Sequence, residues 1–236
     1  MHTGKIGFIF LFLAFAAGTA AAEHDVFTAE IFLRDSDQQE PLFSYTSKVV
    51  QDRNLKSIIH SYFTPENELF AEETVSLKSG KFYSHTSAFP VFEESSLLVR
   101  EGDSLIFTYT KKGRTRSRTF PFREYIYGPT RQDFFNAVLP FLLEGETIAF
   151  ELPFPQMLNF VEFRIYLIEN SPFRRPGTKV LEMRTRSLLL RMFAKPIQYV
   201  LDEETGLILE IHGPTTLRRR VGKRWEFFDG SIYFRY

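Results

Sequence analysis

Apolar and polar residues alternate in short stretches along most of the chain, and turn residues separate these stretches. The alternation is clearest over residues 161–167, 181–186 and 207–212. A strand that is buried on one side has this period of two, because successive side chains point to opposite faces of the sheet. The pattern therefore predicts a mainly antiparallel β protein.

Three turns are expected between these strands, at Thr64–Asn67, at Lys112-Gly113 and at Asp202–Gly206. Each contains a Gly or Asn that tolerates a positive φ angle, as tight hairpin turns require. If Lys112-Gly113 is a two-residue turn, Tyr109 lies opposite Arg116 and Phe107 opposite Arg118. These four side chains then share one face of the sheet with Leu105.

Charge pairing predicts a register for a further hairpin, between Asn159–Ile168 and Thr178–Arg186. In this register Glu162 lies opposite Arg184 and Arg164 opposite Glu182, because opposite charges across a strand pair are stabilising. A shift by one residue would place the apolar side chains on the wrong face.

Helical spacing of apolar residues predicts a main helix over Arg131–Leu143, on the pattern Phe134, Phe135, Val138, Leu139 and Leu142. Thr130 and Asp133 are expected to form a capping box, and Gly145 to end the helix. Pro140 is expected to kink or break it. A second short helix is expected over Ser187–Phe193, before Pro196. The predicted fold is one β-rich domain over residues 23–236, an open barrel or strongly curved antiparallel sheet with the main helix on its concave side.

The N-terminus has the three parts of a secretory signal peptide. A positive start at Lys5 is followed by an apolar run over Ile6–Ala17 and by small residues, with Ala20 and Ala22 as an A-x-A cleavage site. The run is shorter than the roughly 20 residues of a membrane-spanning helix. We expect cleavage after Ala22 and a protein located in the periplasm, or secreted.

Composition changes this picture in three ways. The residues after Ala22 carry 28 basic and 29 acidic side chains, so the chain lacks the net positive charge usual in nucleic-acid-binding proteins. There is no Cys, which excludes disulfides and thiolate chemistry. The 27 Phe must pack in an apolar core or line an apolar cavity.

Sequence motifs that would indicate a catalytic or metal site are lacking. The four His after the leader are His24, His60, His85 and His212, and no two of them have metal-ligand spacing on a helix. No nucleophile elbow or phosphate-binding glycine loop is present. We expect no cofactor, no metal and no enzymatic activity, with a hydrolase built from carboxylates as a less favoured alternative.

The Phe content and the arginine-aromatic face together predict a site for a lipid-like apolar ligand. Arg116 and Arg118 would stand at its rim and bind an anionic head group. Its lining would consist of Phe107, Tyr109, Phe134, Phe135 and Val138. The alternative is a surface strand whose Arg stems cover aromatic rings.

Two C-terminal features bear on partners. Arg218, Arg219, Arg220, Lys223 and Arg224 form a basic cluster, either a solvated loop or a transient, peripheral contact with an anionic membrane surface. The final residues, 231–236, resemble the terminal strand of an outer-membrane β-barrel, which keeps that class as an alternative. A structural or scaffold protein with a protein partner in the cell envelope is a further alternative.

Several short stretches, in this order, are similar to a group of uncharacterised exported bacterial proteins. They are Thr64–Leu69, Ala71–Glu73, Gly128–Thr130 with Asp133-Phe134, Leu143–Glu146, Lys195–Ile197 and Asp202–Gly206. The resemblance implies an open β half-barrel wrapped on a helix. More distantly, this plan is similar to periplasmic lipoprotein carriers, whose concave sheet holds acyl chains. The resemblance implies no catalytic residues.

Overall fold

The computed structural model describes residues 27–35, 40–122, 132–187 and 195–236. Within these ranges the chain forms one α-helix, α1 (Gln132–Leu143), two short 3-10 helices, η1 (Pro90–Phe92) and η2 (Pro155–Met157), and fourteen strands. The strands are β1 (Phe27–Leu33), β2 (Phe43–Asp52), β3 (Leu55–Phe63), β4 (Leu69–Lys78), β5 (Lys81–Phe89), β6 (Glu94–Glu101), β7 (Ser104–Lys111), β8 (Arg114–Pro121), β9 (Ile148–Phe154), β10 (Asn159–Ile168), β11 (Thr178–Thr185), β12 (Ile197–Asp202), β13 (Ile208–Val221) and β14 (Arg224–Arg235).

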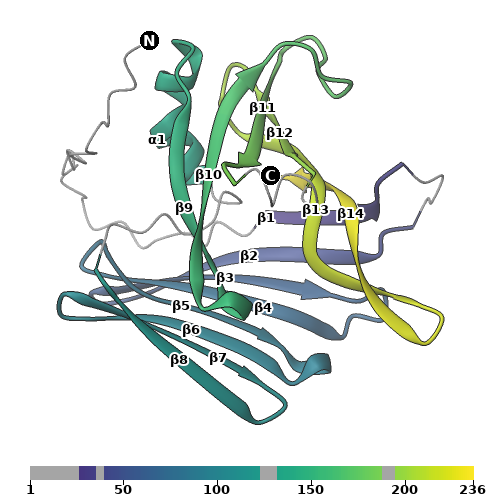
Figure 1. Cartoon of the computed structure of the whole chain (residues 1–236). Coiled ribbons are helices and arrows are strands. Elements are labelled where there is room, and N and C mark those ends of the chain that lie inside the picture. The colour runs from purple at the N-terminus through teal and green to yellow at the C-terminus, as the bar shows by residue number, and fades with distance from the viewer. Residues whose placement is uncertain (1–26, 36–39, 123–131, 188–194) are drawn as a thin grey trace.

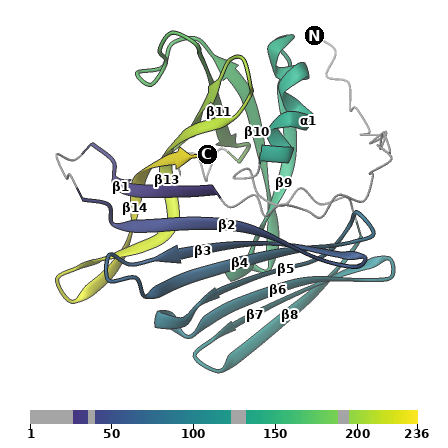
Figure 2. The ribbon, with the colours of Figure 1, turned by 180° about the vertical axis from the view of Figure 1, so that it is seen from behind.

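All fourteen strands belong to one antiparallel sheet with the order β8-β7-β6-β5-β4-β3-β2-β1-β14-β13-β12-β11-β10-β9. Consecutive strands are neighbours except β8 and β9, and the first strand, β1, pairs with the last, β14. The sheet curves strongly and does not close, because β8 and β9 are its two edges (Figures 1 and 2). The predicted open, strongly curved antiparallel sheet is confirmed.

The main helix is also confirmed, since α1 covers the described part of the predicted range and ends at the predicted Leu143. The helix continues through Pro140, so the break expected there does not occur. Asn136, whose carbonyl loses its hydrogen-bond donor at Pro140, is exposed, so water can satisfy that carbonyl. Gly145 ends the helix with a φ of +86°, and its N–H donates to the Leu142 carbonyl.

Apolar side chains on the inner face of the sheet form three separate clusters. The first contains four residues of α1 packed on β9 to β13, among them Phe135 and Leu142. The second lies between β1, β2, β4 and the middle of β13 and β14. The third lies on β5 to β8, beneath the end of the β9–β10 hairpin. The concave side of the sheet is therefore divided into three regions.

The hairpin registers agree with the sequence in one case and differ in another. Lys112 and Gly113 form the predicted two-residue turn, with φ angles of +49° and +71°. In the β10–β11 hairpin, however, Arg164 lies opposite Arg184, so the predicted pairing of Glu162 with Arg184 is wrong. Glu162 instead pairs with Arg186, at 2.5 Å. A shift of two residues leaves every side chain on its own face, so the alternating pattern does not distinguish the two registers.

Several predictions fall outside the described part of the chain. These are the leader, the Thr130–Asp133 capping box and, beyond Ser187, the second helix over Ser187–Phe193. Within the described residues, no helix is both long enough and apolar enough to span a membrane.

Candidate functional site

Strands β7 and β8 bring four of the predicted ligand-site residues together on the inner face. Tyr109 pairs with Arg116 and Phe107 with Arg118, as the two-residue turn predicted. Phe107 is 1% exposed, in the cluster that includes Phe120. Phe160, at the start of β10, covers both rings, with centroid distances of 6.1 Å to Phe107 and 5.1 Å to Phe120.

The two arginines lie on the open edge of the sheet, because β8 pairs with β7 on one side only. The Arg116 guanidinium lies 5.5 Å from the Tyr109 ring and donates to the Gln156 carbonyl at 3.0 Å. The Arg118 guanidinium lies 4.8 Å from the Phe120 ring. Both side chains therefore combine an aromatic contact with an exposed positive charge at the border of the third apolar cluster.

The helical residues predicted to line the same site lie elsewhere. Phe134, Phe135 and Val138 are buried in the first cluster, where Phe135 packs 4.8 Å from the Tyr199 ring. Neither Phe107 nor Tyr109 belongs to this cluster. The structure thus places the predicted lining residues in two separate regions of the concave side.

A buried carboxylate, Glu94 on β6, joins three elements over this face. Glu94 is 4% exposed, and it accepts hydrogen bonds from Arg218 of β13 at 3.1 and 3.3 Å and from Gln156 of η2 at 3.3 Å. Lys111 of β7 lies 3.3 Å away. Burial alone would raise the pKa of Glu94. The hydrogen bonds and the positive charge of Arg218 lower this pKa, and hydrogen bonds from Tyr109 and Lys111 lower it further. Glu94 is therefore ionised and holds the β13–β14 hairpin and η2 against β6.

A row of polar residues crosses the inner face from β2 to β7. Direct cross-strand neighbours make up the row, namely Ser47, His60, Glu73, Ser87, Ser96 and Tyr109. The Tyr45 hydroxyl contacts His60 Nδ1 at 2.6 Å, and the hydroxyls of Ser87 and Ser96 are 2.7 Å apart. Burial raises the pKa of Glu73 from 4.5 to about 7. The concave side thus carries a carboxyl whose pKa is raised towards neutral pH.

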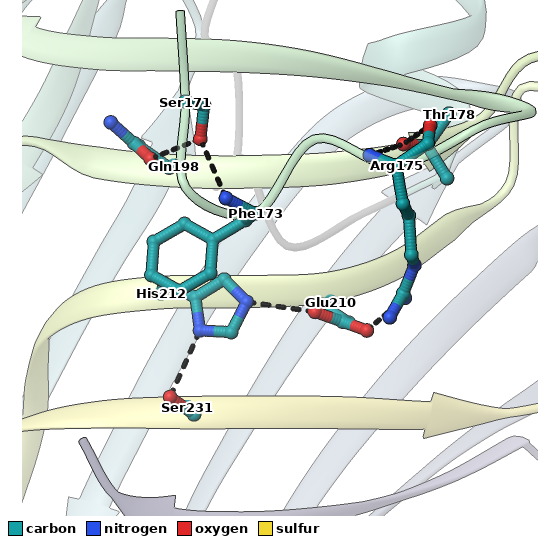
Figure 3. Close-up of polar contacts among 8 residues, drawn as sticks. All are labelled: Ser171, Phe173, Arg175, Thr178, Gln198, Glu210, His212 and Ser231. Atoms are coloured by element: carbon teal, nitrogen blue, oxygen red, sulfur yellow. Dashed lines mark hydrogen bonds and ion pairs between the residues drawn. The ribbon is translucent and has the colours of Figure 1, made fainter. Parts of the chain in front are cut away.

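A second polar cluster lies on the outer face, beneath the β10–β11 connection (Figure 3). His212 of β13 contacts Ser231 Oγ through Nδ1 and Glu210 Oε2 through Nε2, each at 2.9 Å. Glu210 also pairs with Arg175. The Phe173 ring stacks on the imidazole with a centroid distance of 3.7 Å, and His212 is only 1% exposed.

These contacts have the order of a serine–histidine–carboxylate relay, yet the surroundings do not suit acyl transfer. An oxyanion hole needs N–H donors directed at open space beside the nucleophile. Ser231 lies on an interior strand and pairs with His212 on one side and Phe32 on the other, so the ladder occupies the neighbouring N–H groups. Phe173 covers the imidazole. The arrangement instead fixes the connection carrying Phe173 and Arg175 to the sheet.

Electrostatics agree with this structural role. Burial alone would raise the pKa of Glu210, but hydrogen bonds from His212 and Arg175 lower it, so the Arg175 pair is maintained at neutral pH. This cluster was not predicted from the sequence. Its one local signal is the spacing of Glu210 and His212, two residues apart on a strand and so on one face. Ser231 and Arg175 are brought to them by the fold alone.

The fold and these sites define a mainly β protein with one curved, open antiparallel sheet and a helix on its concave side. No protein-family model matches the chain, and no curated protein is similar to it in sequence. Among solved structures, it is similar to a β-barrel-like protein of the domain of unknown function DUF1849 from Brucella abortus. The two share 6% identity with a TM-score of 0.42, over 89% of this chain and 94% of that one.

Proposed function

We propose that this chain is an exported, non-enzymatic protein that binds a lipid-like apolar ligand on the inner face of β7 and β8. The observation that supports this most directly is an apolar cluster at the open edge of the sheet. Phe107 and Phe120 lie there under the end of the β9–β10 hairpin, and Arg116 and Arg118 stand at the border. The leader is the basis for proposing a periplasmic or secreted location.

The end of the β9–β10 hairpin, with η2, Leu158 and Phe160, forms a cover over this cluster. Side chains hold this cover in place, and no strand ladder does. Because β8 and β9 are both sheet edges, no backbone ladder joins them. The polar contacts that hold η2 in place run from Arg116 to the Gln156 carbonyl and from the Gln156 amide to Glu94. A ligand could therefore displace the cover without breaking a strand pair.

An acyl chain would take the place of Leu158 and Phe160 on the rings of Phe107 and Phe120. Each buried methylene contributes about 0.8 kcal/mol, so a long chain can compensate for exposing the two displaced side chains. Arg116 and Arg118 would then pair with a carboxylate or phosphate at the edge, since guanidinium groups form strong, directional hydrogen bonds with such anions.

The test is a native mass spectrometry titration of the chain from Glu23 to Tyr236, with palmitate and with hexadecanol as probes. We expect one saturable site for each. The Arg116→Ser/Arg118→Ser double variant should bind palmitate at least tenfold more weakly than the wild type, while its hexadecanol binding stays within twofold. Lys112→Ser, at the tip of the same hairpin, is the matched control and should behave as the wild type.

Two results would refute the proposal. One is a protein that carries no lipid on purification and binds neither probe saturably. The other is binding that Phe160→Ala leaves unchanged, because removal of this ring should alter the affinity for any chain that replaces it.

A further inference from the structure

The far end of the β13–β14 hairpin, Arg218–Phe227, is a second exposed feature and lies away from α1 (Figures 1 and 2). The strands pair there from Arg218–Phe227 to Val221–Arg224, around a turn at Gly222 with a φ of +61°. We call this segment the distal hairpin. It is formed by a regular ladder and presents a fixed surface.

The distal hairpin carries four basic residues besides Arg218, namely Arg219, Arg220, Lys223 and Arg224, and a single acidic one, Glu226, which lies opposite Arg219. None of the four forms an ion pair with a carboxylate of the described residues. Arg218, by contrast, turns inward to Glu94. The tip therefore carries a net positive charge.

Large apolar side chains are exposed on the same hairpin. Phe227 is 62% exposed, and Trp225 and Val221 are each 41% exposed. The neighbouring η1 adds Val91, which is 53% exposed. Exposed aromatic residues clustered on one element mark an interaction surface more often than isolated ones do.

The base of the distal hairpin is anchored to the body of the protein. The Trp225 ring lies 5.2 Å from Phe92 and 5.8 Å from Phe70. The Arg218 guanidinium lies 4.4 Å from the Phe92 ring and 4.8 Å from the Phe227 ring while it pairs with Glu94. These contacts hold Trp225 and the base of the distal hairpin against η1 and β4.

We propose that the distal hairpin docks the protein on an anionic lipid bilayer. Trp and Phe favour the interfacial region of a bilayer, and Lys and Arg extend their charges to lipid head groups while their stems remain apolar. Each basic residue near an anionic surface strengthens binding about fivefold. The combination of four such residues with exposed Trp, Phe and Val matches this surface in both charge and polarity. The inference rests on residues distinct from those of the proposed ligand site and does not require it.

The single Trp of the chain is Trp225, which provides a reporter at the proposed contact. The experiment titrates the chain from Glu23 to Tyr236 with phosphatidylcholine vesicles that contain 30% phosphatidylglycerol. All described strands and the helix lie after Glu23, so this chain retains the fold. We expect a blue shift of Trp225 emission and co-sedimentation with these vesicles, and much weaker binding to pure phosphatidylcholine vesicles or at 0.5 M salt.

The Arg220→Ser/Lys223→Ser double variant should lower vesicle affinity roughly 30-fold, because two basic contacts are lost. Phe227→Ser should reduce co-sedimentation without changing the salt dependence. The matched control is Lys112→Ser/Arg114→Ser, which removes two charges from the β7–β8 hairpin tip and should stay within twofold of the wild type. All substituted positions are exposed, and unchanged circular dichroism confirms that the variants fold.

Three results would overturn the proposal. They are no binding to anionic vesicles, equal binding to neutral vesicles, and an equal loss for the control variant. Capture of an acidic envelope protein by the distal hairpin in the absence of vesicle binding would assign the surface to a protein partner instead. None of these outcomes depends on whether palmitate binds at β7 and β8.

Discussion

Replacement of Glu73 by Gln tests whether the concave side of the sheet is as poorly solvated as its packing implies. Glu73 lies in the polar row between His60 and Ser87, and burial raises the pKa of its carboxyl from 4.5 to about 7. Gln keeps the size of the side chain and its capacity for hydrogen bonds but does not titrate. The difference between the two proteins therefore isolates the protonation of this one group.

The expected magnitude follows from linkage between protonation and folding. The folded protein holds the Glu73 proton more tightly than the unfolded chain, so this group favours folding below pH 4.5 and loses that contribution as the pH rises towards 7. A shift from 4.5 to about 7 corresponds to about 3 kcal/mol in the free energy of unfolding. Glu73 keeps some exposed surface, which makes this value an upper limit.

The assay is urea denaturation of wild type and Glu73→Gln at intervals from pH 4 to 8. The stability of the variant relative to the wild type should rise by 1 to 3 kcal/mol between pH 4.5 and 7, and stay level outside that interval. Ser87→Ala alters a neighbour in the same row without removing a titratable group, so its difference from the wild type should not vary with pH. A level or falling curve for Glu73→Gln would show that water reaches the carboxyl freely and that the inner face is open there.

Three further predictions concern stability. Glu94→Gln should lower the free energy of unfolding by about 3 kcal/mol, because the largely buried Arg218 loses its charged partner; an unchanged urea midpoint would contradict the role given to Glu94. Gly213→Ala should cost 2 kcal/mol or more, because φ is +147° and the added Cβ would lie 2.9 Å from the Pro196 carbonyl oxygen. Gly80→Ala, with open space around it, should cost only about 1 kcal/mol in the same urea denaturation assay. Glu210 has a lowered pKa, so its contribution should be present above pH 4.5 and lost below it, and Glu210→Gln should flatten the acid limb of the stability curve.

Local sequence signals predicted the elements of this fold well. The alternation over residues 161–167 and 181–186 corresponds to β10 and β11, and Lys112-Gly113 forms the expected turn. The main helix ends at the predicted Leu143. Such features depend on side chains close together in the sequence, where period and turn chemistry apply directly.

The register of β10 and β11 could not be predicted from local sequence signals. Pairing Glu162 with Arg184 or with Arg186 satisfies the same alternation and the same attraction of opposite charges. The two differ by two residues, and the choice between them depends on the nine-residue connection between the strands and on its contacts with His212 and Glu210. Contacts of that kind are absent from any single strand.

The candidate site could be predicted only in part, because some of its contacts join residues that are far apart in the chain. The face shared by Phe107, Tyr109, Arg116 and Arg118 follows from one hairpin, and the structure places them together. The position of α1 depends on which region of the concave side it covers, and it packs on β9 to β13. Glu94 and Arg218, which are 124 residues apart, meet only because β13 and β14 extend across the sheet.

The pairing of β1 with β14 explains why the proposed ligand site lies where it does. In a meander the first and last strands usually form the edges, but here they pair, and the opening falls between β8 and β9. The strand that carries Arg116 and Arg118 is therefore an edge, and the hairpin that covers Phe107 and Phe120 begins with the other edge strand. Movement of this cover would break side-chain contacts with Arg116 and Glu94 while the ladders on both sides stay paired. A ligand that enters there thus needs to displace only a few polar contacts and one small apolar cluster, while the strand pairs of the sheet stay intact.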